Sequence, residues 1–344
     1  MAIFNEVDYL PEGLVDCDSR ALHALLQKPT LIHLQGRHPD PLFVSVLMHG
    51  NETVGWDAMR RLLPKYTVAG GSQELPRSLS LFIGNVEAAK ASVRALPDQP
   101  DYNRIWPGCN YEFSGVKLPE HEMAEQIVKI MRERNVFASI DVHNNTGMNP
   151  HYACVNVVQD DFLRLAALFG RTVVFFTEPC QVCSMAMADL CPAVTLECGK
   201  VGSEHGIEHA MEYLDACLHL HTLEGHPVPA HDIDLFHTVA TVKIPEEITF
   251  GFEENDVEVT FSRNVEHLNF RELTTGTYFA SVSGFEDVPL YVFHENESVT
   301  PDDYFMMRDQ DIVFRKPVMP SMLTMNKDVI RQDCLCYLME RYQI

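Results

Sequence analysis

Metal-binding side chains follow directly after an apolar run near the start of the chain. The stretch VSVLMHGNETVGW places His49 and Glu52 three residues apart, with Gly50 and an asparagine between them. Two histidines and one glutamate are a known ligand set for a catalytic zinc ion, which keeps one position open for water. Taken alone, however, His-x-x-Glu after a strand is more often the polar first turn of a helix.

Two later apolar runs supply the residues that would complete such a site. The run FASIDVH ends in His143, and the run AVTLEC carries Glu197. Ligands of open α/β sheets bind beyond the carboxyl ends of the strands, so these side chains are expected to meet the His49 turn. His143 would be the third zinc ligand, and Glu197 would remain free as a general base. A tight turn at Gly50 would aim His49 and its neighbouring glutamate at one point, and Asp141 could orient a ligating histidine.

Apolar runs of strand length alternate with helical patterns through the first ~225 residues, which is typical of a mostly parallel sheet flanked by helices. The expected strands are 31–36, 42–48, 78–85, 137–143, 152–158, 172–177 and 193–198, and the expected helices are 52–63, 86–95, 119–134, 161–169 and 203–222. From 223–232 onward, prolines and alternation of period two take over. We expect a catalytic, zinc-dependent α/β domain over residues 1–225 and a smaller, mainly β domain over 226–344.

Composition narrows the classes of partner. The chain has 344 residues, is 46% hydrophobic and carries a net charge of −23, which repels nucleic acid and anionic lipid. No basic leader precedes an apolar segment, and no window approaches the ~20 apolar residues of a membrane span. A cytoplasmic protein is expected, with its ten cysteines mainly reduced and buried. The sequence leaves a homo-oligomer open.

Several motifs, in order, resemble those of the succinylglutamate desuccinylase/aspartoacylase family, a branch of the zinc carboxypeptidase clan. They are HGNE (49–52), Asn85 with Arg94 nine residues later, DYNRIWPG (101–108), DVHNNT (141–146), LECGK (196–200) and, more weakly, LNFRELTTGTYFA (268–280). The resemblance spans most of the chain. It implies the zinc-carboxypeptidase-like α/β fold and one zinc ion per chain.

The resemblance also implies a role for each matching residue. The zinc ligands would be His49, Glu52 and His143, and Glu197 would activate water. Arg94 would polarise the scissile carbonyl, while Asn103 and Arg104 would hold a substrate carboxylate. Asn144 and Thr146 would either line the pocket or satisfy the turn after their strand. The implied protein is a zinc-dependent amidohydrolase that cleaves an N-acyl amino acid or a similar small amide. A carboxypeptidase-like metallopeptidase and a non-catalytic zinc-binding protein are the alternatives.

One departure from the family pattern concerns the substrate. Aspartoacylases carry an arginine about ten residues before the catalytic glutamate to hold an aspartate carboxylate, as the resemblance has it, and Met187 stands at that place here. A more apolar pocket is expected, suited to neutral amino acids.

Two further patterns compete for metal. HGIEH, residues 205–209, matches the His-x-x-Glu-His of inverted zinc proteases, although Gly206 weakens the helix and no third ligand follows downstream in a convincing context. A helix start at Ser203 and Glu204 is the preferred interpretation. Cys180 and Cys183 form a Cys-x-x-Cys without a second tight pair, which argues against a structural zinc, and without a thioredoxin-like context. The Met-rich stretch 183–190 is interpreted as flexible apolar packing.

Overall fold

The computed structural model describes residues 3–108, 117–254, 256–294 and 297–343. The chain divides into two compact units. The first comprises Met1–Asn144, His151–Val173 and Pro179–Ile233, and the second comprises Asn145–Pro150, Val174–Glu178 and Asp234–Ile344. None of the helices in these described ranges is both long and apolar enough to cross a membrane.

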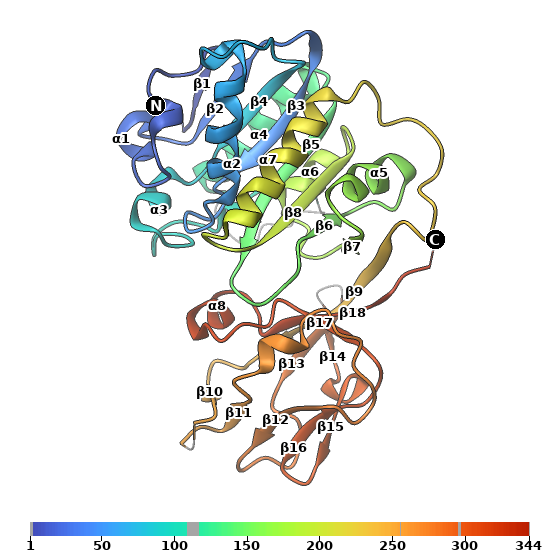
Figure 1. Ribbon diagram of the computed structural model, residues 1–344. Helices are drawn as coiled ribbons and strands as arrows, with labels where there is room; N and C mark the ends of the chain where they lie inside the picture. The colour runs from blue at the N-terminus through green and yellow to red at the C-terminus, as the bar shows by residue number, and fades with distance from the viewer. Residues whose placement is uncertain (1–2, 109–116, 255, 295–296, 344) are drawn as a thin grey trace. The chain divides into compact units, whose positions relative to one another are not determined.

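A mixed sheet forms the centre of the first unit (Figure 1). Its strands are β1 (Asn5–Val7), β2 (Thr30–Leu34), β3 (His38–Val46), β4 (Arg77–Ile83), β5 (Ala138–Asn145), β6 (Tyr152–Val155), β7 (Thr172–Phe175) and β8 (Ala193–Lys200). They lie in the order β1-β2-β4-β3-β5-β8-β6-β7. The central strand β3 runs parallel to both β4 and β5, whereas β2 is antiparallel to β4 and β6 is antiparallel to β8. Strands β2 and β5 are buried along their whole length, as expected of strands covered on both faces.

Helices cover this sheet. They are α1 (Leu22–Leu26), α2 (Val54–Leu62), α3 (Val86–Ala91), α4 (Pro119–Glu133), α5 (Asp160–Phe169), α6 (Cys183–Ala188) and α7 (Glu204–His219). Helices α2 and α7 pack side by side across one face (Figure 1). Helix α7 begins where the Ser203 hydroxyl accepts a hydrogen bond from the Gly206 N–H.

Helix α6 contacts side chains of the central strands β3 and β8 on one face of the sheet. The Ser45 hydroxyl of β3 lies 3.5 Å from the Cys183 sulfur, and the Thr195 hydroxyl of β8 donates to the Ser184 hydroxyl at 2.9 Å. Because side chains alternate along a strand, residues two positions further along β3, β5 and β8 share this face.

The second unit is mainly β. Strands β9 (Asp234–Lys243), β13 (Tyr291–His294), β14 (Glu297–Val299), β17 (Met319–Ser321) and β18 (Cys336–Arg341) pair in antiparallel fashion. A separate sheet in the described part has the order β10-β11-β12-β16-β15, formed by Phe250–Phe252, Val259–Phe261, Tyr278–Val282, Asp311–Phe314 and Phe305–Arg308. Helix α8 spans Lys327–Gln332. The core is aromatic, with the Phe279 ring packed against the rings of Phe261, Phe305 and Phe314 at 5.0–5.4 Å between centroids.

The expected fold class is confirmed: a mixed α/β sheet flanked by helices, with a smaller β sheet domain. One expectation about helices was wrong. The helix expected over 86–95 ends at Ala91, because Ser92 adopts a left-handed conformation that terminates it. In the Met-rich stretch, Cys183–Ala188 forms helix α6 and Met187 is fully buried, in line with the expected apolar packing.

Candidate metal centre and active site

The turn after β3 places His49 at the carboxyl end of this central strand. Leu47 is fully buried and has a φ of 58°, a left-handed conformation that costs a side-chain-bearing residue energy and ends the strand direction abruptly. The tight turn expected at Gly50 is confirmed, because the Glu52 N–H donates to the His49 carbonyl at 3.1 Å. Glycine is required there for a second reason: a Cβ would lie 2.2 Å from the backbone of Ala88 in α3. The Gly50 N–H also donates to the Arg94 carbonyl at 3.1 Å, which ties the turn to the segment after α3.

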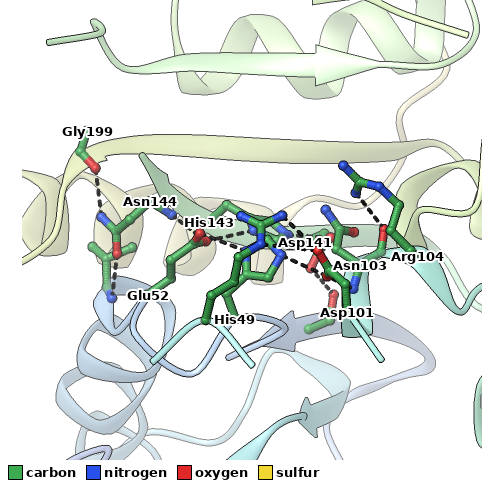
Figure 2. A network of polar contacts seen from close by, with 12 residues as sticks. His49, Glu52, Asp101, Asn103, Arg104, Asp141, His143, Asn144 and Gly199 are labelled. Atoms are coloured by element: carbon green, nitrogen blue, oxygen red, sulfur yellow. Dashed lines mark hydrogen bonds and ion pairs between the residues drawn. The ribbon is translucent and has the colours of Figure 1, made fainter. Parts of the chain in front are cut away.

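His49, Glu52 and His143 converge from β3 and β5, and their ligand atoms all lie within 4.8 Å of one another (Figure 2). His49 Nδ1 lies 2.7 Å from Glu52 Oε1, and His143 Nδ1 lies 2.8 Å from Glu52 Oε2. The two imidazole rings meet edge to face, with centroids 5.0 Å apart. All three side chains are at least 92% buried.

Each histidine also has a carboxylate on its other ring nitrogen. His143 Nε2 donates to Asp141 Oδ2 at 2.9 Å, and His49 Nε2 donates to Asp101 Oδ1 at 3.1 Å (Figure 2). The expected contact of Asp141 with a histidine is confirmed. Asp141 in turn accepts a hydrogen bond of 2.6 Å from the Ser45 hydroxyl. Carboxylates in this position fix the orientation of metal-binding histidines and raise their basicity.

This donor set fits a zinc ion. Two imidazoles and one carboxylate are the ligands of a catalytic zinc site, and both Nδ1 atoms face the carboxylate that would share the metal with them. Burial alone would raise the pKa of the Glu52 carboxyl, but His49 and then His143 hold that pKa well below its usual range. Ionised carboxylates at this depth require a nearby cation, which a divalent metal would provide.

Two hydrogen bonds determine how β5 is aligned with its neighbour β8. The Ser139 N–H donates to the Pro192 carbonyl at 2.9 Å where the two strands begin. The Asn144 side-chain amide donates to the Gly199 carbonyl at 2.9 Å where they end (Figure 2). Residue numbers therefore rise together along both strands, so β5 and β8 run parallel.

This alignment places Glu197 next to a metal-binding residue. In a parallel pair, an N–H donates to the residue preceding its partner, so Ser139 lies beside Ala193. Four residues further along both strands, His143 lies beside Glu197, and both side chains are on the same face of the sheet. Glu197 is 8% exposed. Its side chain therefore projects beside the metal-binding cluster.

Asp101 joins the cluster to an arginine. The Arg94 guanidinium donates to Asp101 Oδ2 through Nε at 3.1 Å and Nη2 at 2.9 Å, while the other carboxylate oxygen faces His49. His49, Arg94 and Arg104 lower the pKa of the Asp101 carboxyl against the effect of its burial. The sequence interpretation missed Asp101. The available signal was an acidic residue opening the DYNR segment beside two candidate site residues.

Asn103 and Arg104 lie in a short 3-10 helix, Tyr102–Arg104, that follows Asp101 (Figure 2). Arg104 Nη1 donates to the Asn103 carbonyl at 2.8 Å. The Asn103 Oδ1 atom is buried and has no hydrogen-bond partner among the described residues. Turning this amide would present its NH₂ group instead, which is the orientation a carboxylate would require. A buried amide without a partner is a suitable contact for a ligand.

Asn144 has a positioning function. Its Oδ1 accepts from the Val54 N–H at 3.1 Å at the start of α2, its Nδ2 donates to Gly199, and its backbone N–H donates to Glu52 Oε2 at 3.0 Å. These bonds favour the interpretation that it satisfies the turn rather than contacts substrate. Thr146 is half-buried and belongs to the second compact unit, so its role in the pocket stays a prediction.

The Cys-x-x-Cys is not a bonded pair. Cys180 is disulfide-bonded, whereas Cys183 is a buried free thiol. The expectation of mainly reduced thiols agrees with the free cysteines of the described residues, and Cys180 is the exception. Eight cysteines in the described residues are free: Cys17, Cys154, Cys183, Cys191, Cys198, Cys217, Cys334 and Cys336.

Replacing Asp141 with asparagine is expected to weaken zinc binding by about 10–100-fold, the range for removing a partner that orients a ligating histidine. The asparagine keeps the size of the side chain but loses the charge that holds His143. Competition with a chromogenic chelator would measure the affinity. Asp160→Asn, at the exposed start of α5, is the matched control. Unchanged affinity in Asp141→Asn would show that the Asp141 contact does not support metal binding.

Comparison with known proteins gives a family match. The model of the "Succinylglutamate desuccinylase/Aspartoacylase catalytic domain" matches residues 41–218, which include all three candidate metal ligands and Glu197. No curated protein matches the chain.

Solved structures share the fold at low sequence identity. Succinylglutamate desuccinylase from Vibrio parahaemolyticus is 14% identical with a TM-score of 0.57, over 89% of this chain and 83% of that one. Succinylglutamate desuccinylase/aspartoacylase from Rhodobacter sphaeroides is 16% identical with a TM-score of 0.57, over 90% and 88%. Murine aminoacylase 3 is 12% identical with a TM-score of 0.57, over 90% and 97%.

Proposed function

Because the chain belongs to the succinylglutamate desuccinylase/aspartoacylase family, we propose that it is a zinc-dependent deacylase that hydrolyses the amide bond of an N-acyl amino acid or a similar small amide. The observation that carries the proposal is the position of Glu197 beside a buried His₂Glu cluster on one face of the sheet. Three ligands with a non-ligating carboxylate nearby are what water activation requires, and a purely structural zinc site is usually closed by a fourth ligand. One zinc ion per chain is proposed.

In this proposal, His49, Glu52 and His143 hold the zinc ion. When bound, zinc supplies Lewis acidity, which activates water and polarises a carbonyl group. Glu197 accepts a proton from the attacking water and delivers it to the nitrogen of the leaving amine. The carboxylate can do so because it lies beside the cluster and is not one of the three ligands.

Arg94 is proposed to stabilise the negative charge that develops on the scissile carbonyl oxygen. Its guanidinium is 17% exposed, and the two bonds to Asp101 hold it close to His49. A donor fixed in advance costs no reorganisation when charge appears, and removing one such donor commonly lowers kcat by about 10²–10³-fold.

Asn103 and Arg104 are proposed to bind the carboxylate of the amino acid product. The Oδ1 atom of Asn103 has no hydrogen-bond partner among the described residues, so the amide can turn its NH₂ group toward a ligand, and the adjacent Arg104 guanidinium supplies further donors from the same short helix. Arginine suits this function because it can grip a carboxylate with two parallel hydrogen bonds. The free thiols of most described cysteines support the further proposal of a cytoplasmic location.

Substrates with a blocked carboxylate test this assignment. An N-acyl amino acid amide is expected to have a kcat/KM at least about tenfold below that of the free acid, since a guanidinium left without its anionic partner is costly. Steady-state assays of both compounds, with native protein and Arg104→Ala, measure the coupling. The ratio between acid and amide should fall toward one in Arg104→Ala. An unchanged ratio in that variant would remove Arg104 from the substrate site.

The identity of the amino acid is a separate prediction. Met187 is fully buried in α6 and offers no charge to an acidic substrate side chain. N-acyl derivatives of neutral or apolar amino acids should therefore exceed N-acetylaspartate in kcat/KM by about tenfold or more, the scale of one ionic contact. A panel with one acyl group and varied amino acids measures this. Preference for N-acetylaspartate would contradict it, and preference for unacylated peptides would favour the carboxypeptidase alternative.

A further inference from the structure

Three histidines gather on the first unit in a cluster that the proposed deacylase does not use. His151 directly precedes β6, whereas His205 and His209 lie one turn apart in α7, within the HGIEH motif. The rings stack: the centroid of His151 is 5.0 Å from that of His205 and 5.1 Å from that of His209. No downstream residue follows HGIEH in a convincing ligand context, whereas the structure supplies a third histidine from upstream.

Two nitrogen atoms of the cluster already stand at a separation that a metal can bridge. His151 Nδ1 lies 2.9 Å from His209 Nδ1, close enough for one ring to donate a hydrogen bond to the other. Zinc–nitrogen bonds of about 2.0–2.1 Å at near-tetrahedral angles place two ligand atoms roughly 3.3 Å apart. The rings therefore need to part by only a few tenths of an ångström for one ion to bind both Nδ1 atoms. The proton of the donating Nδ1 would move to the Nε2 of the same ring, which keeps that imidazole neutral.

Nδ1 is the nitrogen through which His151 and His209 face each other, so a shared ion would bind there. The backbone of Phe169 hydrogen-bonds His209, and the Phe169 ring stacks on that imidazole at 4.2 Å. His151 Nε2 lies beside Gly199, where an added Cβ would be only 2.9 Å from it. A backbone carbonyl on the second ring nitrogen is the usual support of a metal-binding histidine.

His205 is placed to become the third ligand. It lies four residues before His209, the spacing that puts two histidines on one face of a helix. It is exposed, so its side chain can rotate without disturbing the core. Its ring centroid is 6.1 Å from that of His209, and a change of rotamer would bring a nitrogen toward the other two.

Both inner histidines favour the neutral form that metal binding needs. Burial, and then His209 and His205, lower the pKa of His151 to about 4. Burial also lowers the pKa of His209, although the hydrogen bond to the Phe169 backbone acts in the opposite direction and raises it. A metal ion would thus not compete with protons on these two rings at neutral pH.

We propose that His151, His205 and His209 form a second metal site, for a divalent ion of the zinc type. Imidazole suits zinc, copper and nickel, whereas calcium and magnesium prefer oxygen ligands. Because His205 is exposed and must reorient, this site binds more weakly than the buried His₂Glu cluster and exchanges its ion with solvent. The net charge of −23 favours retention of cations at both sites.

Zinc titration of the full chain by equilibrium dialysis, with elemental analysis of bound zinc, tests the proposal. Native protein should take up two zinc ions per chain, one tightly and one weakly. His209→Ala and His205→Ala should each weaken the second event at least about tenfold, a loss in the range seen on removing even an orienting partner of a ligand. His143→Ala should lose the tight event and keep the weak one, which separates this site from the deacylase centre.

His219→Ala is the matched control, because His219 lies on the same helix with its Nδ1 bonded to the Asp215 carbonyl. That variant should bind two zinc ions as the native protein does. A second measurement needs no variant: the second zinc ion should protect His205 from acylation by diethyl pyrocarbonate, mapped by mass spectrometry. Uptake of a single ion at saturation, a second ion retained in both His205→Ala and His209→Ala, or unchanged acylation of His205 would overturn the proposal.

Discussion

Glu197→Gln should lower kcat by about 10³-fold or more while zinc content and thermal stability stay near those of the native protein. Glutamine has the same shape but cannot accept the proton that the attacking water must lose. The site can tolerate the change because Glu197 lies beside the metal cluster without being one of its three ligands. Steady-state rates on an N-acyl amino acid, together with elemental analysis of the same samples, measure both quantities.

Glu266→Gln is the control for burial alone. Glu266 is 6% exposed and accepts a hydrogen bond from the Met325 N–H within the second unit, whereas the proposed chemistry is assigned to residues of the first unit. That variant should keep its rate even if it loses some stability. Full activity in Glu197→Gln would show that Glu197 is structural and that the mechanism is wrong.

The second large effect concerns the metal ligands. His49→Ala and His143→Ala should each lose nearly all tightly bound zinc, because two remaining ligands cannot hold the ion against water. Loss of His143 also removes the imidazole partner of the buried Asp141 carboxylate, which then retains the hydrogen bond from the Ser45 hydroxyl. Elemental analysis after dialysis against a weak chelator gives the stoichiometry, and circular dichroism establishes that each variant is folded.

His33→Ala is the matched control for these variants. His33 is also buried, in β2, where its ring contacts the Ser80 hydroxyl and Glu6 instead of the cluster. It should retain one tightly bound zinc ion. Tight zinc that survives His143→Ala but disappears in His205→Ala would move the principal site to the HGIEH motif.

Much of the site followed from where residue types stand along the chain. The periodicity of apolar residues predicted the central strands. Because ligands bind at the carboxyl ends of such strands, the sequence alone predicted that His49, Glu52 and His143 lie together. Boundaries shifted by a few residues, since local conformations such as the left-handed Ser92 are decided by packing.

Other features depended on contacts between distant segments. Asp101 lies in a loop 52 residues after His49, and no periodic pattern indicates their hydrogen bond. His151 precedes HGIEH by more than fifty residues, whereas the motif predicts a third ligand downstream, so the sequence pattern does not indicate His151. Gly50 was correctly singled out for its tight turn, but the close approach of α3 to this glycine exists only in the folded chain.

The most direct test of the central claim is the initial rate of amine release from a panel of N-acyl amino acids, measured on metal-stripped protein before and after addition of one equivalent of zinc. We expect no turnover without metal and full turnover at one equivalent, with N-acyl neutral amino acids as the best substrates. Equal rates before and after zinc addition, or no hydrolysis of any N-acyl amino acid by the zinc-loaded protein, would contradict the assignment of this chain as a zinc-dependent deacylase.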